Sequence, residues 1–264
     1  MKQSGEIFSK HPYPSPNPHI QLNEIIYWSN GFRVKGLLAE PKGKGNYEGI
    51  LYLRGGIQRI GMVRPSRIAQ FAAQGFVVFA PYYRGNRGGE GFDEFAGDDR
   101  YDAVHAVDVL KRFIKVHRIH IFSFSRGGIM ALWTAILRND ITSLVTWAGV
   151  SDASLTYEER KDMRRMMKRV IGGTPSNHPE LYHARTPLHF MDEFKPPVLI
   201  IHGLKDQHVR PLHAKKLEEN LLQKNSEVKT WYFDEYTHHF PPDVNAQVVR
   251  DLTTWMRLQK GELK

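Results

Sequence analysis

The sequence predicts an α/β domain in which a mostly parallel central sheet carries helices on both faces. Short apolar runs that end in glycine or polar turns alternate along the chain with segments of helical periodicity. This alternation follows a strand-rich start, and regular strand-helix units build parallel sheets. A length of 264 residues suits one domain of this class.

The beginning of the chain divides into an expected flexible segment and an expected hairpin. Residues 1–23 are polar and rich in proline, so we expect a flexible segment there. The folded domain is expected over residues 24–264. It opens with two strands between 24 and 39, because the Ser-Asn-Gly sequence at 29–31 is typical of a tight turn between strands.

The later elements are predicted in order from their periodicity. Strands are expected at 49–54, 76–80, 119–124, 144–147, 197–202 and 228–233. Helices are expected at 65–74, 99–116, 127–137, 156–171, 179–194, 211–223 and 244–258. The helix-rich stretch at about 151–194 interrupts the regular order, and we interpret it as a lid or insert beside the site.

Composition limits the kind of protein and its location. The chain contains no cysteine, which excludes disulfides and thiolate sites and is typical of a reducing compartment. No apolar run reaches membrane-spanning length, so we expect a cytoplasmic protein with no membrane contact. The net charge of +9 is spread along the chain. Its densest cluster, at 160–169, alternates with methionines and is interpreted as a solvated helix face, so no nucleic-acid partner is expected. No cofactor and no metal are expected, and the oligomeric state is left open.

A candidate nucleophile stands where a predicted strand passes directly into a predicted helix. The sequence Ser-Phe-Ser-Arg-Gly-Gly at 123–128 places Ser125 at the centre of a sharp turn, with the small residues Ser123 and Gly127 two positions away on either side. This is the arrangement of a nucleophile elbow. A serine in such a turn can also be a simple helix cap, so the interpretation depends on the rest of the chain.

Candidate partners for Ser125 follow two later strands. Asp206 lies just after the strand at 197–202, and His238 and His239 follow the strand at 228–233. The order serine, acid, histidine is that of a hydrolase triad in which the acid orients the imidazole. Backbone N–H groups of Gly56, in the Arg-Gly-Gly sequence after the strand at 49–54, and of Arg126 are candidates for an oxyanion hole.

Taken together, these segments resemble the catalytic domain of the prolyl oligopeptidase family of α/β-hydrolases. The matching segments are Leu-Arg-Gly-Gly at 53–56, Tyr-Tyr-Arg-Gly-Asn-Arg-Gly at 82–88, Ser-Phe-Ser-Arg-Gly-Gly at 123–128, Gly-Gly-Thr-Pro at 172–175, His-Gly-x-x-Asp-x-x-Val at 202–209 and Thr-His-His-Phe at 237–240. The likeness runs from about residue 24 to 258. It implies the α/β-hydrolase fold and favours His238 over His239 as the base.

The resemblance implies a serine hydrolase with a Ser125–His238–Asp206 triad that acts on short peptides or small carboxylic esters. Arg54 stands where the family usually has histidine, and Arg126 replaces the usual aromatic residue. The 264 residues leave no room for the family's β-propeller, so a stand-alone catalytic domain is expected.

Three other expectations concern the surroundings of the triad. Arg84 and Trp147 are candidates to line a substrate pocket, with a solvated loop charge as the alternative for Arg84 and a core residue as the favoured alternative for Trp147. Arg126 is a candidate to face a substrate carboxylate. The alternative function is a non-catalytic α/β-hydrolase-fold protein that binds a ligand or partner.

Overall fold

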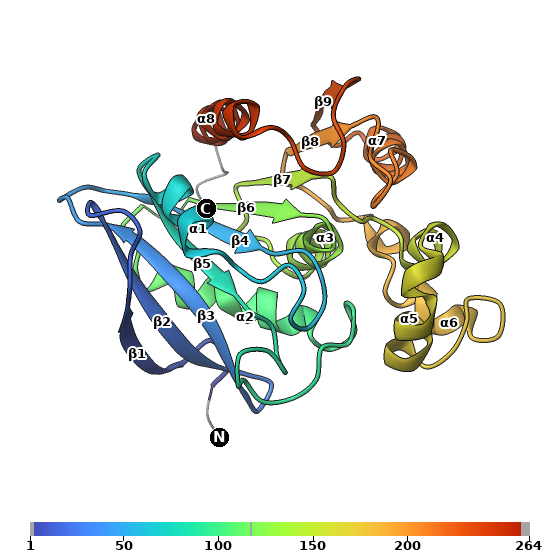
Figure 1. Cartoon of the computed structure of the whole chain (residues 1–264), viewed down its shortest axis with the longest axis horizontal. Coiled ribbons are helices and arrows are strands. Elements are labelled where there is room, and N and C mark those ends of the chain that lie inside the picture. Colours follow the sequence, from blue (N-terminus) through green and yellow to red (C-terminus); the bar gives the residue numbers. More distant parts are fainter. Residues whose placement is uncertain (1–2, 117, 260–264) are drawn as a thin grey trace.

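A nine-stranded sheet runs through the molecule, and helices cover both of its faces (Figure 1). The computed structural model describes residues 3–116 and 118–259. The strands are β1 Ile7–Tyr13, β2 Ile20–Ser29, β3 Phe32–Pro41, β4 Glu48–Leu53, β5 Phe76–Pro81, β6 Ile119–Phe124, β7 Ser143–Trp147, β8 Val198–Gly203 and β9 Val228–Phe233. The α-helices are α1 Pro65–Ala72, α2 Arg100–Lys111, α3 Gly127–Leu137, α4 Ala153–Glu159, α5 Arg164–Ile171, α6 Pro179–His183, α7 Leu212–Gln223 and α8 Pro242–Leu258. Two short 3-10 helices are η1 Lys161–Met163 and η2 Pro187–Phe190.

The strand order of the sheet is β1-β2-β3-β5-β4-β6-β7-β8-β9. The pairings from β1 to β5 are antiparallel, and those from β5 through β4 to β9 are parallel. The parallel strands β4, β6, β8 and β9 therefore end at the same edge, and ligands of such sheets bind beyond that edge. The mostly parallel sheet with helices on both faces confirms the predicted fold class.

Two apolar clusters, one on each face, hold the sheet between the helices. Successive residues of β4 alternate between them: Ile50 and Tyr52 pack with α1 and α8, and Leu51 and Leu53 pack with α2 and α3. Every residue of β4 is buried, which is typical of a central parallel strand. The strand that leads to the candidate oxyanion loop is thus among the most firmly enclosed parts of the molecule.

The structure corrects the expectation of a flexible segment over residues 1–23 for residues 3–23, whereas residues 1 and 2 lie outside the described residues. Strand β1 pairs with β2 in an antiparallel register that joins His11 to Glu24 and Pro12 to Asn23. Proline is tolerated because β1 is an edge strand, where an amide that cannot donate leaves no neighbour unpaired. The proline-rich stretch after β1 forms the turn that leads into β2.

The insert between β7 and β8 is also more broken than the sequence pattern predicts. The expected helix at 156–171 is divided among α4, η1 and α5, and that at 179–194 among α6 and η2. Prolines begin both α6 and η2, because proline fits the first turn of a helix and not its interior. Within the described ranges, no helix is both long and apolar enough to cross a bilayer.

Candidate active site

Ser125 lies in a strained turn between β6 and α3. Its φ is +55°, a left-handed conformation that few non-glycine residues adopt. Three backbone hydrogen bonds hold it there: its N–H donates to the Trp147 carbonyl at 3.1 Å, and its carbonyl accepts from the N–H groups of Gly128 and Val150, each at 2.9 Å. Such strain persists only where the surrounding structure fixes it.

The small residues around Ser125 are required by close backbone approaches. A Cβ on Gly127 would lie 2.1 Å from the Leu53 carbonyl oxygen, and one on Gly55 would lie 2.7 Å from the Cβ of Ser125. The hydroxyl of Ser123 donates to the Val145 carbonyl at 3.0 Å, and this hydrogen bond satisfies the polar group of the buried side chain. These contacts are the physical reason for the small-residue pattern of the elbow.

Asp206 and His238 form a buried pair at the same edge of the sheet. The Nδ1 of His238 donates to Asp206 Oδ2 at 2.7 Å, and the backbone N–H groups of His208 and Val209 donate to Oδ1 at 2.8 and 3.1 Å. Burial opposes ionisation of Asp206, but the His238 hydrogen bond and charge together with the two N–H donors hold the pKa of this carboxyl below its usual value. This bond orients the His238 ring, and among the described residues Nε2, the second ring nitrogen, has no hydrogen-bond partner.

The structure separates the two adjacent histidines. His238 is 6% exposed, whereas His239 is exposed and stacks on Phe124 at 5.5 Å between ring centroids. The Asp206 carboxylate bonds His238 and not His239. His208 lies beside His238 at 5.2 Å between ring centroids and is a neighbour that the sequence pattern did not indicate.

The loop at 55–61, which follows β4, brings Gly56 to the pocket of Ser125, and the Gly56 N–H is one of the two expected oxyanion-hole donors. Gly56 has a φ of +67°, and a Cβ there would lie 2.2 Å from the Ile60 carbonyl oxygen. Within residues 3–116 and 118–259, neither the Gly56 nor the Arg126 N–H donates an internal hydrogen bond. Both residues line the pocket that contains Ser125.

The Arg54 side chain holds the 55–61 loop through hydrogen bonds to carbonyl groups of the loop. Its guanidinium donates to the carbonyl oxygens of Gly55 at 2.9 Å and Ile60 at 3.1 Å, as well as to Tyr82 at 3.0 Å. The side chain is only 1% exposed. The arginine that departs from the family pattern is therefore a buried support of the loop.

Arg126 supports the same loop from the other side. It donates to the Gly56 carbonyl at 3.1 Å and pairs with Asp93 at 2.7 Å and Asp99 at 2.5 Å. Although burial opposes it, the charges of Arg126 and Arg54 hold the pKa of Asp93 below its usual value. The expectation that the Arg126 side chain faces a substrate carboxylate is corrected, because its charge is already matched by two buried carboxylates.

Neither of the two candidate pocket residues lines the pocket that contains Ser125. Arg84 is 3% exposed and pairs with the fully buried Asp102 at 2.8 Å, so its charge is matched inside the protein. Trp147 is 1% exposed and belongs to the core beside α8. It reaches a neighbouring cavity, described below, but not the pocket of Ser125.

A cavity of about 740 Å³, here called the Ser125 pocket, contains Ser125, His238 and the 55–61 loop. Its apolar lining comes from the segments that follow β4, β5 and β7 and from the insert, and includes Ile57, Val63, Phe95, Val150, Met163 and Met166. Met167, the next methionine of the insert, is fully buried in the core. The size lies within the range that holds small ligands.

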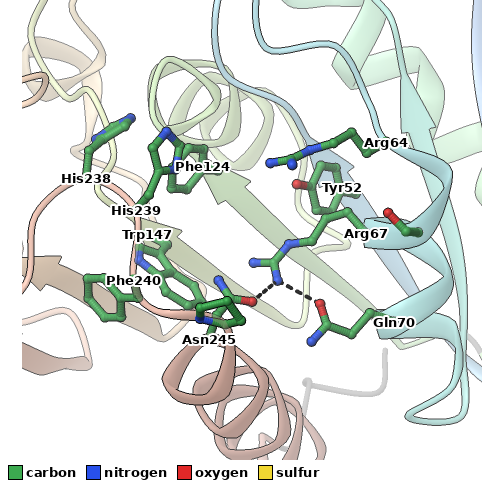
Figure 2. Close-up of a pocket in the computed structure, with 12 residues that line it drawn as sticks. Tyr52, Arg64, Arg67, Gln70, Phe124, Trp147, His238, His239, Phe240 and Asn245 are labelled. Carbon is green, nitrogen blue, oxygen red and sulfur yellow. Dashed lines mark hydrogen bonds between the residues drawn. The ribbon is translucent and has the colours of Figure 1, made fainter.

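A second cavity of about 600 Å³, here called the arginine pocket, adjoins the first (Figure 2). The two cavities share Tyr52, Arg64, Arg67, Phe124, His238 and His239. Arg64 and Arg67 were not indicated by any motif. The only sequence signal is their place at the start of the helix that follows the Arg-Gly-Gly segment. Among the described residues, no group of three or more His, Asp or Glu side chains is placed to hold a metal ion.

Sequence comparison finds close and distant relatives. A family model described as the prolyl oligopeptidase family matches residues 62–261. An uncharacterized peptidase, YtmA of Bacillus subtilis (strain 168), is 58% identical over 254 residues, which span 95% of this chain and 99% of that protein. A second uncharacterized peptidase of the same organism, YuxL, is 26% identical over 83% of this chain and 36% of its own length.

Comparison of structures finds the same fold in peptidases and esterases. Acylaminoacyl peptidase of Pyrococcus horikoshii superposes with a TM-score of 0.78 at 18% identity, covering 97% of this chain and 42% of that one. An acetyl xylan esterase from Paenibacillus sp. R4 superposes with a TM-score of 0.74 at 16% identity, covering 96% of this chain and 88% of that one. The chain thus spans less than half of the peptidase and most of the esterase.

Proposed function

Because the chain belongs to the prolyl oligopeptidase family, we propose that it is a serine hydrolase in which Ser125 is the nucleophile, His238 the base and Asp206 the orienting acid. The observation that carries the proposal is the 2.7 Å bond between His238 and Asp206, in the wall of the pocket that also contains the strained Ser125. A binding protein has no physical need for this combination of serine, base and acid.

The proposed reaction is acyl transfer through Ser125. The Ser125 Oγ attacks the substrate carbonyl carbon while Nε2 of His238 takes the hydroxyl proton. The tetrahedral intermediate collapses with cleavage of the bond to the leaving amine or alcohol, which receives that proton from His238. Water, deprotonated by His238, then attacks the acyl ester, releases a carboxylic acid and restores the Ser125 hydroxyl.

The charge that develops on the carbonyl oxygen is proposed to be stabilised by the N–H groups of Gly56 and Arg126. Support comes from their place in the Ser125 pocket and from their freedom from internal bonds among the described residues. The loss of one such donor typically costs about 3 kcal/mol of transition-state stabilisation. Arg54 and Arg126 act on this step indirectly, since both hold the loop that carries Gly56.

The proposed substrates are short peptides or small carboxylic esters whose acyl side is apolar. The apolar lining of the Ser125 pocket supports this class. Met163 and Met166 come from the segment at about 151–194, so we propose that this segment forms a wall or lid over the acyl group. We retain one hydrolase domain with this insert as the domain organisation.

Reaction with a fluorophosphonate probe tests the proposal. Purified wild-type protein should be labelled at Ser125, and Ser125→Ala should lose both labelling and ester or peptide turnover, by about six orders of magnitude in kcat. Ser15→Ala, which changes an exposed serine far from the pocket, is the matched control. A folded wild-type protein that the probe leaves unlabelled would contradict the role of Ser125 as the nucleophile and favour the non-catalytic alternative.

A further inference from the structure

The arginine pocket combines two cations with a lining that contains no carboxylate. Its polar lining includes Arg64, Arg67, Ser66, Gln70 and Asn245 together with the two histidines. Among residues 3–116 and 118–259, no Asp or Glu pairs with Arg64 or Arg67. The buried arginines 54, 84 and 126, by contrast, are all matched by carboxylates.

Arg67 is held in place without being neutralised. One terminal nitrogen donates to the amide oxygens of Gln70 at 2.8 Å and Asn245 at 2.5 Å. The guanidinium also lies over the aromatic ring of Trp147, 5.5 Å from its centroid. Amide oxygens and an aromatic face orient the group but leave its full charge available to a ligand.

Arg64 adds a second charge at the mouth of the same cavity. It is the exposed residue that precedes α1, three positions before Arg67. Figure 2 shows the side chains of Arg64, just before α1, and Arg67, in the first turn of α1, extending toward the wall formed by Phe124, His239 and Phe240. An anion in the cavity would therefore meet two guanidinium groups from one helix start.

The position of the arginine pocket relative to the proposed mechanism identifies the part of the substrate that reaches it. His238 must donate a proton to the leaving group, so the leaving group departs on the side of its ring. The Ser125 pocket holds Ser125 and the 55–61 loop, and the arginine pocket continues from it past His238 and His239. The acyl part thus belongs to the first cavity and the leaving group to the second.

We propose that the arginine pocket binds a carboxylate on the leaving group, and that the preferred peptide substrates are cleaved close to a free C-terminal carboxylate. This inference rests on the proposed serine hydrolase. In a peptide substrate, the part that leaves as an amine would hold the carboxylate that binds Arg64 and Arg67. In an ester substrate of the same class, the part that leaves as an alcohol would hold it. The free carboxylate thereby limits the substrates to short peptides or to the ends of chains.

Matched acid and amide substrates test this inference. N-acetyl-Xaa-Gly peptides with Ala, Leu or Phe at Xaa are prepared with a C-terminal carboxylate or carboxamide, alongside hexanoyl esters of glycolic acid and of glycolamide. The wild-type protein should favour the acid over the amide in kcat/KM by about tenfold or more, the range expected for charge-assisted hydrogen bonds. The preference should shrink as salt is raised.

Variants assign the preference to the two arginines. Arg67→Gln should lower the acid-to-amide ratio by about tenfold, and the exposed Arg64→Gln by about threefold, as for screened charges. Arg64→Gln covers the possibility that Arg67→Gln fails to fold. Arg112→Gln, which removes an exposed charge at the end of α2, should keep the wild-type ratio.

The outcomes separate this inference from the proposed function. Equal rates, a preference for the amides, or a fluorophosphonate-labelled protein that cleaves neither member of any pair would overturn the carboxylate site and leave the serine hydrolase in place. A ratio that persists in both arginine variants would also overturn it. Failure of the wild-type protein to react with the fluorophosphonate would instead overturn the proposed function.

Discussion

At Ser125 the backbone sets the geometry before the side chain contributes any chemistry. The left-handed φ turns the residue out of the sheet, and the bonds to Trp147, Gly128 and Val150 fix it. The sequence could predict this turn because the steric demand is local: two residues before and two after must be small. The sequence could not predict the direction of the Arg126 side chain, because its partners Asp93 and Asp99 come from a distant loop.

The buried His213 predicts a pH dependence of stability. Burial lowers the pKa of His213 to about 4, and its Nδ1 accepts the Ser151 N–H at 3.3 Å. Its charged and titratable neighbours are Asp152, Glu159, Asp206, Lys216 and His202. As pH falls below about 6.5, the unfolded chain takes up a proton that the folded protein refuses until about pH 4, so stability falls across this window. The shift corresponds to about 3 kcal/mol.

Urea unfolding between pH 7 and 4 measures this effect as the difference between wild type and His213→Gln. The variant should lose stability less steeply with falling pH, since it has no proton to gain. His19→Gln, at an exposed histidine, should follow the wild-type curve. Parallel curves for wild type and His213→Gln would contradict the prediction.

At the scale of an element, the 55–61 loop depends on Asp93 although Asp93 lies outside it. Asp93 pairs with Arg126 at 2.7 Å and with Arg54 at 3.7 Å, and it accepts the Gln58 N–H at 3.2 Å. Asp93→Asn removes one of the carboxylates that balance these two arginines. We expect a loss of about 3 kcal/mol in the free energy of unfolding, since breaking a buried pair leaves a charge uncompensated.

The same variant should label more slowly with the fluorophosphonate, because a looser loop holds the Gly56 N–H less well. The rate is measured below the unfolding transition and compared with Asp98→Asn, which changes an exposed carboxylate nearby. If folded Asp93→Asn reacts at the wild-type rate, the loop does not need this carboxylate.

Secondary structure could be predicted where burial imposes one regular spacing of apolar residues along the chain. It could be predicted less well where burial imposes no such spacing. The strands β4 to β9 are buried or half-buried apolar runs, and the sequence indicated each of them. The insert was predicted as two long helices because its apolar positions repeat at helical spacing. The helices are interrupted at Arg160 and near Thr186. These interruptions depend on contacts with distant parts of the chain, such as the hydrogen bond from Arg160 to the His208 carbonyl at 3.1 Å.

At the scale of the whole molecule, stability should decrease from the centre of the sheet to its edges. All residues of β4 and β5 are buried, whereas no residue of β1 or β9 is fully buried. Edge strands open by local fluctuations that do not require the core to separate. We expect hydrogen exchange to be slowest in β4, β5 and β6 and fastest, among strands, in β1 and β9. Protection of β1 equal to that of β4 would contradict this order.

The overall architecture followed from the order of strands and helices, but the second cavity did not. The order fixes which strand ends share an edge, and it placed Ser125, Asp206 and His238 together there. The arginine pocket depends on α1 and α8, which lie on the same face of the sheet and meet through Arg67 and Asn245. Such a meeting of side chains has no periodic signal in the sequence. The cytoplasmic location stays a prediction.

The shared carboxylate of Asp93 has an evolutionary consequence. Arg54 and Arg126 lie far apart in the chain but pair with the same buried carboxylate, so we expect the three positions to be inherited as one unit. A lineage that replaced any one of them alone would pass through a destabilised ancestor. Descendants with a neutral residue at position 54 are therefore expected to have changed at position 93 or 126 as well, and reconstruction of ancestral sequences would reveal these replacements as paired events.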